Sequence, residues 1–134
     1  MTLIRPYQDR DLEGLLEVWE KALPLDAVTR DDFERRVILD VNREPDSLLL
    51  AFDKEDAPPL GFVLCLVLRR PIEETGLLEN RGFITAFGVD PNRRREGIGT
   101  ALITRAEDFF RSRKRKPEMR HQISRSRDSA VPTR

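Results

Sequence analysis

The chain has 134 residues, enough for one domain with a hydrophobic core. It contains no apolar run of about 18 residues and no basic and apolar leader, so we expect neither a membrane span nor a secretory signal. Its single cysteine excludes an internal disulfide, which fits a reducing compartment. From these features we expect a cytoplasmic protein.

The net charge of zero conceals an uneven distribution along the chain. Residues 111–134 hold nine Lys or Arg and two Asp or Glu, whereas residues 1–110 carry an excess of acidic side chains. A basic tail can bind nucleic acid or a membrane. This tail has no Phe, Trp or Tyr for base stacking and the rest of the chain is acidic, so we expect no nucleic-acid partner.

The first part of the chain predicts a strand and two helices. A short strand is expected at residues 3–7, and apolar residues at helical spacing predict a helix over 11–22 that Pro24 ends. Thr29 has the character of a helix cap and begins a second helix that we expect to reach about residue 40.

Two apolar runs follow, at residues 47–52 and 60–68, with a polar, proline-rich turn between them. They predict an antiparallel hairpin whose second strand is buried on both faces. A loop over residues 69–81 then leads to a third run. Its length favours a functional role, since loops often carry substrate contacts.

Residues 82–111 combine a strand, a glycine-containing turn and a helix. The apolar, strand-favouring run ends at Asp90, and an arginine-rich turn with Gly97 and Gly99 leads into an amphipathic helix. Glycine lets the backbone approach an anion closely, and the free N–H groups at a helix start bind phosphate. Gly88, inside the strand, fits either a β-bulge or the close approach of a ligand to the backbone.

Two common phosphate-binding turns are excluded. A P-loop needs a Gly-Lys pair, which the chain lacks, and a dinucleotide fingerprint needs a third glycine where Leu102 stands. The pattern that remains is Arg94-x-x-Gly97-x-Gly99 between a strand and a helix.

This turn, within Val89–Leu102, resembles motif A of the GCN5-related N-acetyltransferases (GNAT). The family's pattern is Gln/Arg-x-x-Gly-x-Gly/Ala after a bulged strand, and the order of elements matches over about residues 3–113. The resemblance implies an α+β fold in three layers, with a mixed, mostly antiparallel sheet and helices on both faces. It further implies acetyl transfer from acetyl-CoA to a primary amine of a small molecule or protein, without a metal.

The same resemblance implies roles for the turn and the strand before it. The backbone amides of the turn would hold the pyrophosphate of acetyl-CoA, and the strand would pair with the pantetheine arm through its main chain. Independently of the resemblance, Arg93, Arg94 and Arg95 would add positive charge where a phosphate of the ligand would sit. The expected cofactor contacts are Phe87, Gly88, Val89, Arg94, Arg95, Glu96, Gly97, Ile98, Gly99 and Thr100.

Catalytic residues are harder to identify. In many relatives a tyrosine after motif A protonates the leaving thiolate, but no tyrosine follows Gly99 here. Tyr7 and Cys65 are expected to be packing residues, and His121 lies in the basic tail. The remaining candidates for a general base are acids of the loop before the motif strand, which are equally compatible with a solvated surface: Glu73, Glu74 and Glu79.

The sequence also suggests that the fold is truncated at its C-terminal end. We expect an acetyltransferase-like domain over residues 1–113 and a basic, disordered tail over 114–134, without the family's fifth strand, fourth helix and last two strands. The cofactor slot would then lack one wall. An active N-acetyltransferase, a CoA-binding module without activity, and a homodimer in which a second chain supplies strands all stay open.

Overall fold

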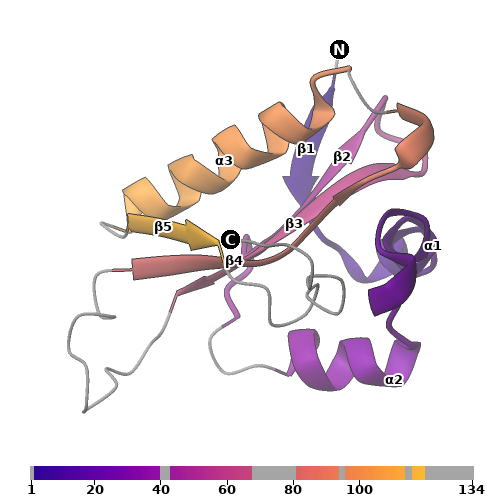
Figure 1. Cartoon of the computed structure of the whole chain (residues 1–134), viewed down its shortest axis with the longest axis horizontal. Coiled ribbons are helices and arrows are strands. Elements are labelled where there is room, and N and C mark those ends of the chain that lie inside the picture. The colour runs from indigo at the N-terminus through magenta and orange to yellow at the C-terminus, as the bar shows by residue number, and fades with distance from the viewer. Residues whose placement is uncertain (1, 40–42, 68–80, 94–95, 114–115, 120–134) are drawn as a thin grey trace.

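The computed structural model describes residues 2–39, 43–67, 81–93, 96–113 and 116–119. Within them, a five-stranded sheet has the order β1-β2-β3-β4-β5. Its strands are β1 (Leu3–Pro6), β2 (Leu48–Phe52), β3 (Pro59–Val67), β4 (Arg81–Val89) and β5 (Lys116–Met119). The first four pair antiparallel and β5 pairs parallel to β4, so the sheet is mixed and mostly antiparallel, as predicted (Figure 1).

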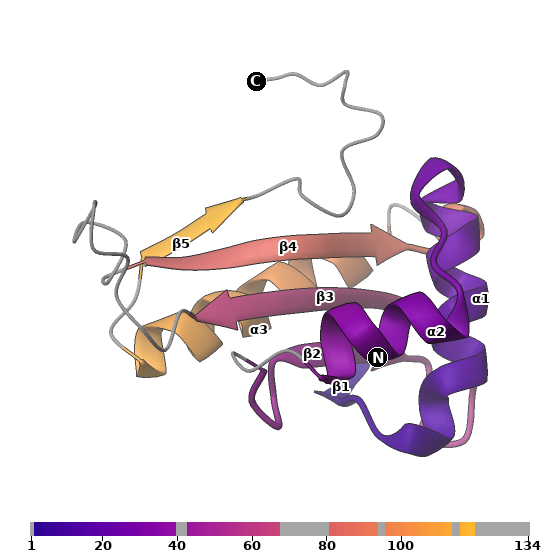
Figure 2. The same cartoon turned by 90° about the horizontal axis from the view of Figure 1, so that it is seen from below.

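Helices cover both faces of this sheet, which confirms the predicted layers. One face carries α1 (Leu12–Ala22) and α2 (Arg30–Phe33), which a π-helical turn extends over Glu34–Ile38. The other face carries α3 (Ile98–Ser112), as Figure 1 and Figure 2 show. The second predicted helix therefore ends at Ile38, slightly earlier than expected. None of the described helices combines the length and apolar content needed to cross a bilayer.

Each face of the sheet has its own apolar core. On the α1 side, the Trp19 ring stacks on Phe62 with centroids 4.6 Å apart, and Phe33 meets Trp19 edge-on. On the α3 side, Leu102 and Phe110 are fully buried against the sheet. These two cores hold α1 and α3 against opposite faces of the central strands.

A β-bulge at Thr85 interrupts the pairing of β4 with β3. Ala86 pairs with Leu64, but Ile84 pairs with the next β3 residue, Cys65, so Thr85 has no pairing partner on β3. Because side chains alternate along a strand, one extra residue reverses which of them face α3.

The bulge thereby brings both halves of β4 to α3. Ile84, before the bulge, belongs to the α3 core, and Phe87 and Val89, after it, also pack against that core. An unbulged strand would turn Phe87 and Val89 toward α1. The bulge of the family pattern is therefore present, but at Thr85. Gly88 pairs regularly with Phe62, so of the two alternatives at Gly88 the structure excludes the bulge, and the close approach of a ligand stays a prediction.

The fifth strand corrects the sequence analysis. β5 pairs in parallel with Arg81–Ile84, so the expectation that no fifth strand follows Arg113 is wrong. Its sequence, Lys-Pro-Glu-Met, has no apolar period and contains a proline, so propensity gives no signal for a strand. Residues 120–134 lie outside the described part of the chain, and their disorder stays a prediction.

Arg113 fixes the chain between α3 and β5. Its guanidinium donates to Glu44 (2.8 Å) and Asp46 (2.9 Å), which precede β2, and lies 3.8 Å from the centroid of the Phe109 ring. These contacts tie the end of α3 to the segment before β2.

A partly buried ion pair joins β1 to the start of α1. The Arg5 guanidinium donates to both carboxylate oxygens of Asp11, at 2.8 and 2.9 Å, and the Gln8 N–H donates to the same carboxylate at 2.8 Å. Burial alone would raise the pKa of Asp11, but these hydrogen bonds outweigh it and lower the pKa below its ordinary value.

Phe110→Ala tests the core between α3 and the sheet. The ring is fully buried, so its removal should lower the free energy of unfolding by about 3–5 kcal/mol. Leu39→Ala is the control, because Leu39 is 70% exposed and should cost less than about 0.5 kcal/mol. Urea unfolding followed by circular dichroism measures both. Equal losses would contradict the assigned core.

Asp11→Asn tests the ion pair through its pH dependence. At neutral pH we expect the free energy of unfolding to fall by about 1–3 kcal/mol. A carboxylate with a lowered folded-state pKa stabilises above its ordinary pKa of 3.8 and loses this effect as the pH falls through the folded-state value. In urea unfolding the gap between the two proteins should narrow toward about pH 2.5. A gap that stays constant would contradict the assignment.

Candidate functional site

The site is built around the connection between β4 and α3. A 3₁₀ turn over Pro91–Arg93 follows β4, and α3 begins after Gly97. The Asp90 carboxylate accepts a hydrogen bond from the Asn92 N–H at 2.9 Å, and the Asp90 N–H donates to the Leu60 carbonyl at 2.7 Å. Asp90 therefore caps this turn and anchors it to β3.

The two glycines of the turn are required for different reasons. Gly97 has φ = +83°, a left-handed conformation, and a Cβ there would meet nothing within 4 Å. Its role is conformational. Gly99 lies within the helix, where a Cβ would be 3.3 Å from the Phe87 ring and 3.6 Å from Val89. Its role is to let α3 approach β4 closely.

At the start of α3, three backbone amides have no hydrogen-bond acceptor among the described residues. Its first backbone hydrogen bond runs from the Ala101 N–H to the Gly97 carbonyl, at 3.0 Å, and no side chain caps the helix. The N–H groups of Ile98, Gly99 and Thr100 therefore have no acceptor within the helix. Such a helix end carries partial positive charge and suits an anion, above all a phosphate.

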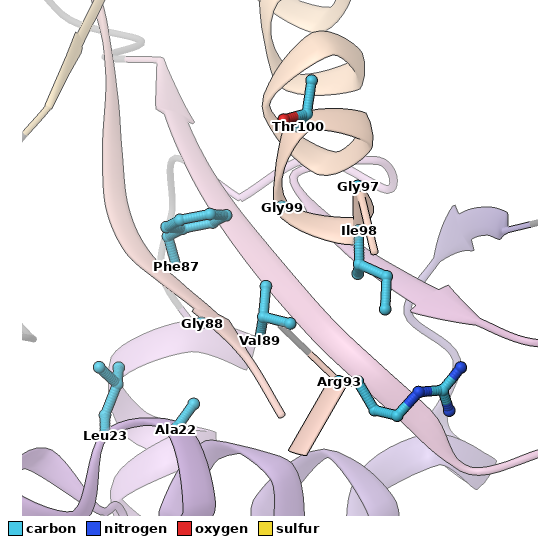
Figure 3. A pocket seen from close by; sticks show the side chains of 10 residues that line it. All are labelled: Ala22, Leu23, Phe87, Gly88, Val89, Arg93, Gly97, Ile98, Gly99 and Thr100. Carbon is cyan, nitrogen blue, oxygen red and sulfur yellow. The ribbon is translucent and has the colours of Figure 1, made fainter. Parts of the chain in front are cut away.

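These amides border a cleft of about 450 Å³ between β4 and α3 (Figure 3). The β4 wall faces the first turn of α3 across the cleft, and the end of α1 closes one side. The lining residues are Ala22, Leu23, Phe87, Gly88, Val89, Arg93, Gly97, Ile98, Gly99 and Thr100. A second hollow of about 540 Å³ shares Phe87, Gly99 and Thr100 and continues along α3 to Glu107.

One edge of β4 is open beside the cleft. On one edge β4 pairs with β3 along its length, but on the other edge β5 pairs only with Arg81–Ile84. Among the described residues, the main chain after Ile84 has no strand partner on that second edge. Its N–H and C=O groups are available to an extended ligand.

The structure brings together most of the predicted contacts. Seven of them line the cleft, namely Phe87, Gly88, Val89, Gly97, Ile98, Gly99 and Thr100. Arg94 and Arg95 lie outside the described residues. Glu96 is exposed, does not line the cleft, and accepts hydrogen bonds from Arg93 instead.

Sequence reasoning missed the contribution of α1 to the cleft. Ala22 and Leu23 end the first helix, far from the turn in sequence. A Cβ on Gly88 would lie 2.8 Å from the Ala22 Cβ, so glycine at this position lets α1 and β4 meet. A glycine opposite a small residue is visible only once the packing is known.

The described residues add no clear catalytic group. Tyr7 is buried in the α1 core against Phe33, and burial raises its pKa. Burial also raises the pKa of Cys65 to about 12, so its thiol is unreactive. His121 and the three glutamates of the loop, Glu73, Glu74 and Glu79, lie outside the described residues. No group of three or more potential metal ligands occurs in the described ranges.

Gly97 offers a test of the turn. A left-handed residue with a Cβ costs about 1–2 kcal/mol, and asparagine tolerates this conformation better than alanine. Gly97→Ala should therefore lower the melting temperature more than Gly97→Asn. The structure leaves room for either side chain. Differential scanning calorimetry measures the two shifts, and an equal or reversed order would contradict a left-handed Gly97.

Comparisons with known proteins find a family and similar folds. The family model described as "Acetyltransferase (GNAT) family" matches residues 12–124. No curated protein matches the chain. Among solved structures, a GCN5-related N-acetyltransferase from Sphaerobacter thermophilus is 21% identical, with a TM-score of 0.70 over 88% of this chain and 35% of its own.

Two further structures are similar at lower identity. An aminoglycoside antibiotic 6′-N-acetyltransferase from Acinetobacter baumannii is 18% identical, with a TM-score of 0.68 over 97% of this chain and 86% of its own. The ribosomal-protein-S18-alanine N-acetyltransferase from Escherichia coli is 16% identical, with a TM-score of 0.62 over 84% and 61%. The chain thus spans less than two thirds of the Sphaerobacter and Escherichia proteins.

Identities this low show a common fold and no more. The family assignment rests on the family model, which matches most of the described chain, including the strand, turn and helix that form the cleft. The chain belongs to the GNAT acetyltransferase family.

Proposed function

We propose that this protein binds acetyl-CoA between β4 and α3 and transfers its acetyl group to a primary amine of a small molecule or protein. The observation that carries the proposal is the set of unbonded amides at Ile98, Gly99 and Thr100, which open onto the cleft. They suit the pyrophosphate of the cofactor. The open edge of β4 suits its pantetheine arm, which carries amide groups.

The proposed reaction needs positioning more than covalent help. The amine nitrogen attacks the thioester carbonyl, a C–N bond forms and the C–S bond breaks, leaving an amide and the CoA thiolate. A base takes a proton from the amine and the thiolate gains one. Holding the thioester in the cleft makes attack effectively intramolecular.

The general base stays a prediction. Of the described residues that line the cleft, only Arg93 is titratable, and its guanidinium cannot accept a proton. The glutamates of the loop before β4 remain the candidates, namely Glu73, Glu74 and Glu79. The acceptor also stays open, because the similar structures bear the names of enzymes with ribosomal-protein and aminoglycoside acceptors. A cytoplasmic location belongs to this proposal.

The alternative is a protein that binds CoA without catalysing transfer, or that acts only with strands from a second chain. The open edge of β4 favours it, since a second copy could pair there. Turnover in the monomer distinguishes the two possibilities. The assay measures the release of free thiol from acetyl-CoA with a panel of amines, and the oligomeric state is measured in the same sample. Thiol release by the monomer supports the enzyme.

Thr100→Pro tests the phosphate site directly. Proline removes one unbonded N–H in the first helical turn, where no intrahelical hydrogen bond is lost. We expect affinity for CoA to fall on the order of tenfold, as for the loss of a charge-assisted hydrogen bond. Thr100→Ala keeps the amide and should weaken binding less.

Isothermal titration calorimetry with CoA measures these affinities, and circular dichroism verifies that both variants fold. Absence of CoA binding by the unmodified protein would contradict the proposal outright. Binding that Thr100→Pro and Thr100→Ala weaken equally would place the phosphates elsewhere.

A further inference from the structure

Arg93 links the turn to the hairpin of β2 and β3. Its Nη1 and Nη2 donate to the two carboxylate oxygens of Asp53, both at 2.9 Å, in a bidentate pair. Asp53 immediately follows β2 and is 40 residues away in sequence. The link therefore joins two segments that no strand pairing holds together at this point.

The same guanidinium also binds Glu96. Its Nε donates to both oxygens of the Glu96 carboxylate, at 3.1 and 3.0 Å, and its Nη2 donates to one of them at 2.9 Å. All three guanidinium nitrogens are thus engaged by carboxylates. We name Asp53, Arg93 and Glu96 together the Arg93 clasp.

The clasp spans the turn that leads to α3. Arg93 lies at the end of the 3₁₀ turn and Glu96 immediately precedes Gly97, the residue before the helix. In Figure 3 the Arg93 side chain extends away from Phe87 and Gly88, although its residue lines the cleft. The clasp therefore holds Arg93 and Glu96, which both precede the free amides at the start of α3.

The charges argue against the simpler role of a phosphate ligand for Arg93. The hydrogen bonds that Arg93 donates to Asp53 and Glu96 raise the pKa of Arg93, and the same bonds lower the pKa of both carboxylates. All three groups are charged at neutral pH, so the clasp carries a net charge of −1, from one cation and two anions. Together with its two carboxylate partners, Arg93 therefore brings no net positive charge to the turn.

We propose that the Arg93 clasp is a positioning device, in which Asp53 holds the phosphate-binding turn in register with the β2–β3 hairpin. Its three side chains do not touch the phosphates. They fix the turn so that the amides of Ile98, Gly99 and Thr100 point to one place before the ligand arrives. This inference rests on the proposed function, because it concerns the same phosphate site.

Asp53→Asn separates positioning from charge by the sign of its effect. The substitution removes a negative charge near an anion site, so electrostatics alone predicts tighter CoA binding. It also breaks the charged bidentate pair with Arg93. If the clasp positions the turn, CoA should bind on the order of tenfold more weakly. Residues that hold metal ligands in place have a comparable effect, since their mutation costs about tenfold or more in metal affinity.

Asp56→Asn is the matched control. Asp56 lies on the same exposed connection, carries the same charge and forms no ion pair with a described residue. It should leave CoA affinity unchanged.

Arg93→Lys is the second test, because lysine keeps the charge but cannot bind two carboxylates with a planar fork. It should weaken CoA binding in the same direction as Asp53→Asn.

Isothermal titration calorimetry measures the binding of CoA and, separately, of pantetheine to the unmodified protein and to each clasp variant. Pantetheine lacks the phosphates, so the clasp variants should bind it as the unmodified protein does. In steady-state kinetics the KM for acetyl-CoA should rise in these variants, while kcat and the KM for the amine stay the same.

The failures of the two proposals are distinguishable. If the unmodified protein does not bind CoA, the proposed function fails. If it binds CoA, and Asp53→Asn binds equally well or more tightly, the positioning role is overturned. An equal loss of CoA and pantetheine affinity would also overturn it, because the effect would then not act at the phosphates.

Discussion

The close packing of α3 against β4 is the constraint on which the rest of the structure depends. Gly99 removes the side chain that would separate them, and the bulge at Thr85 turns Phe87 and Val89 to the same face as Ile84. Because of these two features, the start of α3 and the end of β4 border the same cleft. The surrounding elements hold this pair in place, with α1 on the far face of the sheet and Arg113 at the far end of the helix.

The same packing leaves backbone N–H and C=O groups without partners in the helix or the sheet. The first amides of α3 have no acceptor in the helix, and the second half of β4 has an edge without a strand partner among the described residues. Such groups must bind water, a ligand or another chain. The proposed ligand is acetyl-CoA, whose phosphates and pantetheine amides match the two kinds of free group. The clasp at Arg93 fits this account, since amides bind an anion best when the turn before them is already fixed.

The sequence predicted the parts of this site that local chemistry determines. Gly97 and Gly99 after an apolar strand indicated the turn, and the resemblance to motif A supplied the family that the comparison then established. Features set by tertiary contact were missed. β5 has no apolar period, the bulge lies at Thr85 and not at Gly88, and Ala22 reaches the cleft only through helix packing. Arg93 was expected to add positive charge beside a phosphate, and its bond to Asp53, which is distant in sequence, could not be foreseen.

The most direct test of the central claim is an NMR titration of the ¹⁵N-labelled protein with CoA. The account predicts that the amide resonances of Ile98, Gly99 and Thr100 show the largest shifts and that pantetheine, which lacks phosphates, leaves them nearly unchanged. The N–H groups of the α3 start would then be the phosphate ligands. Saturating CoA that leaves these three amides unshifted, or that shifts them no more than amides on the α1 face, would contradict the account.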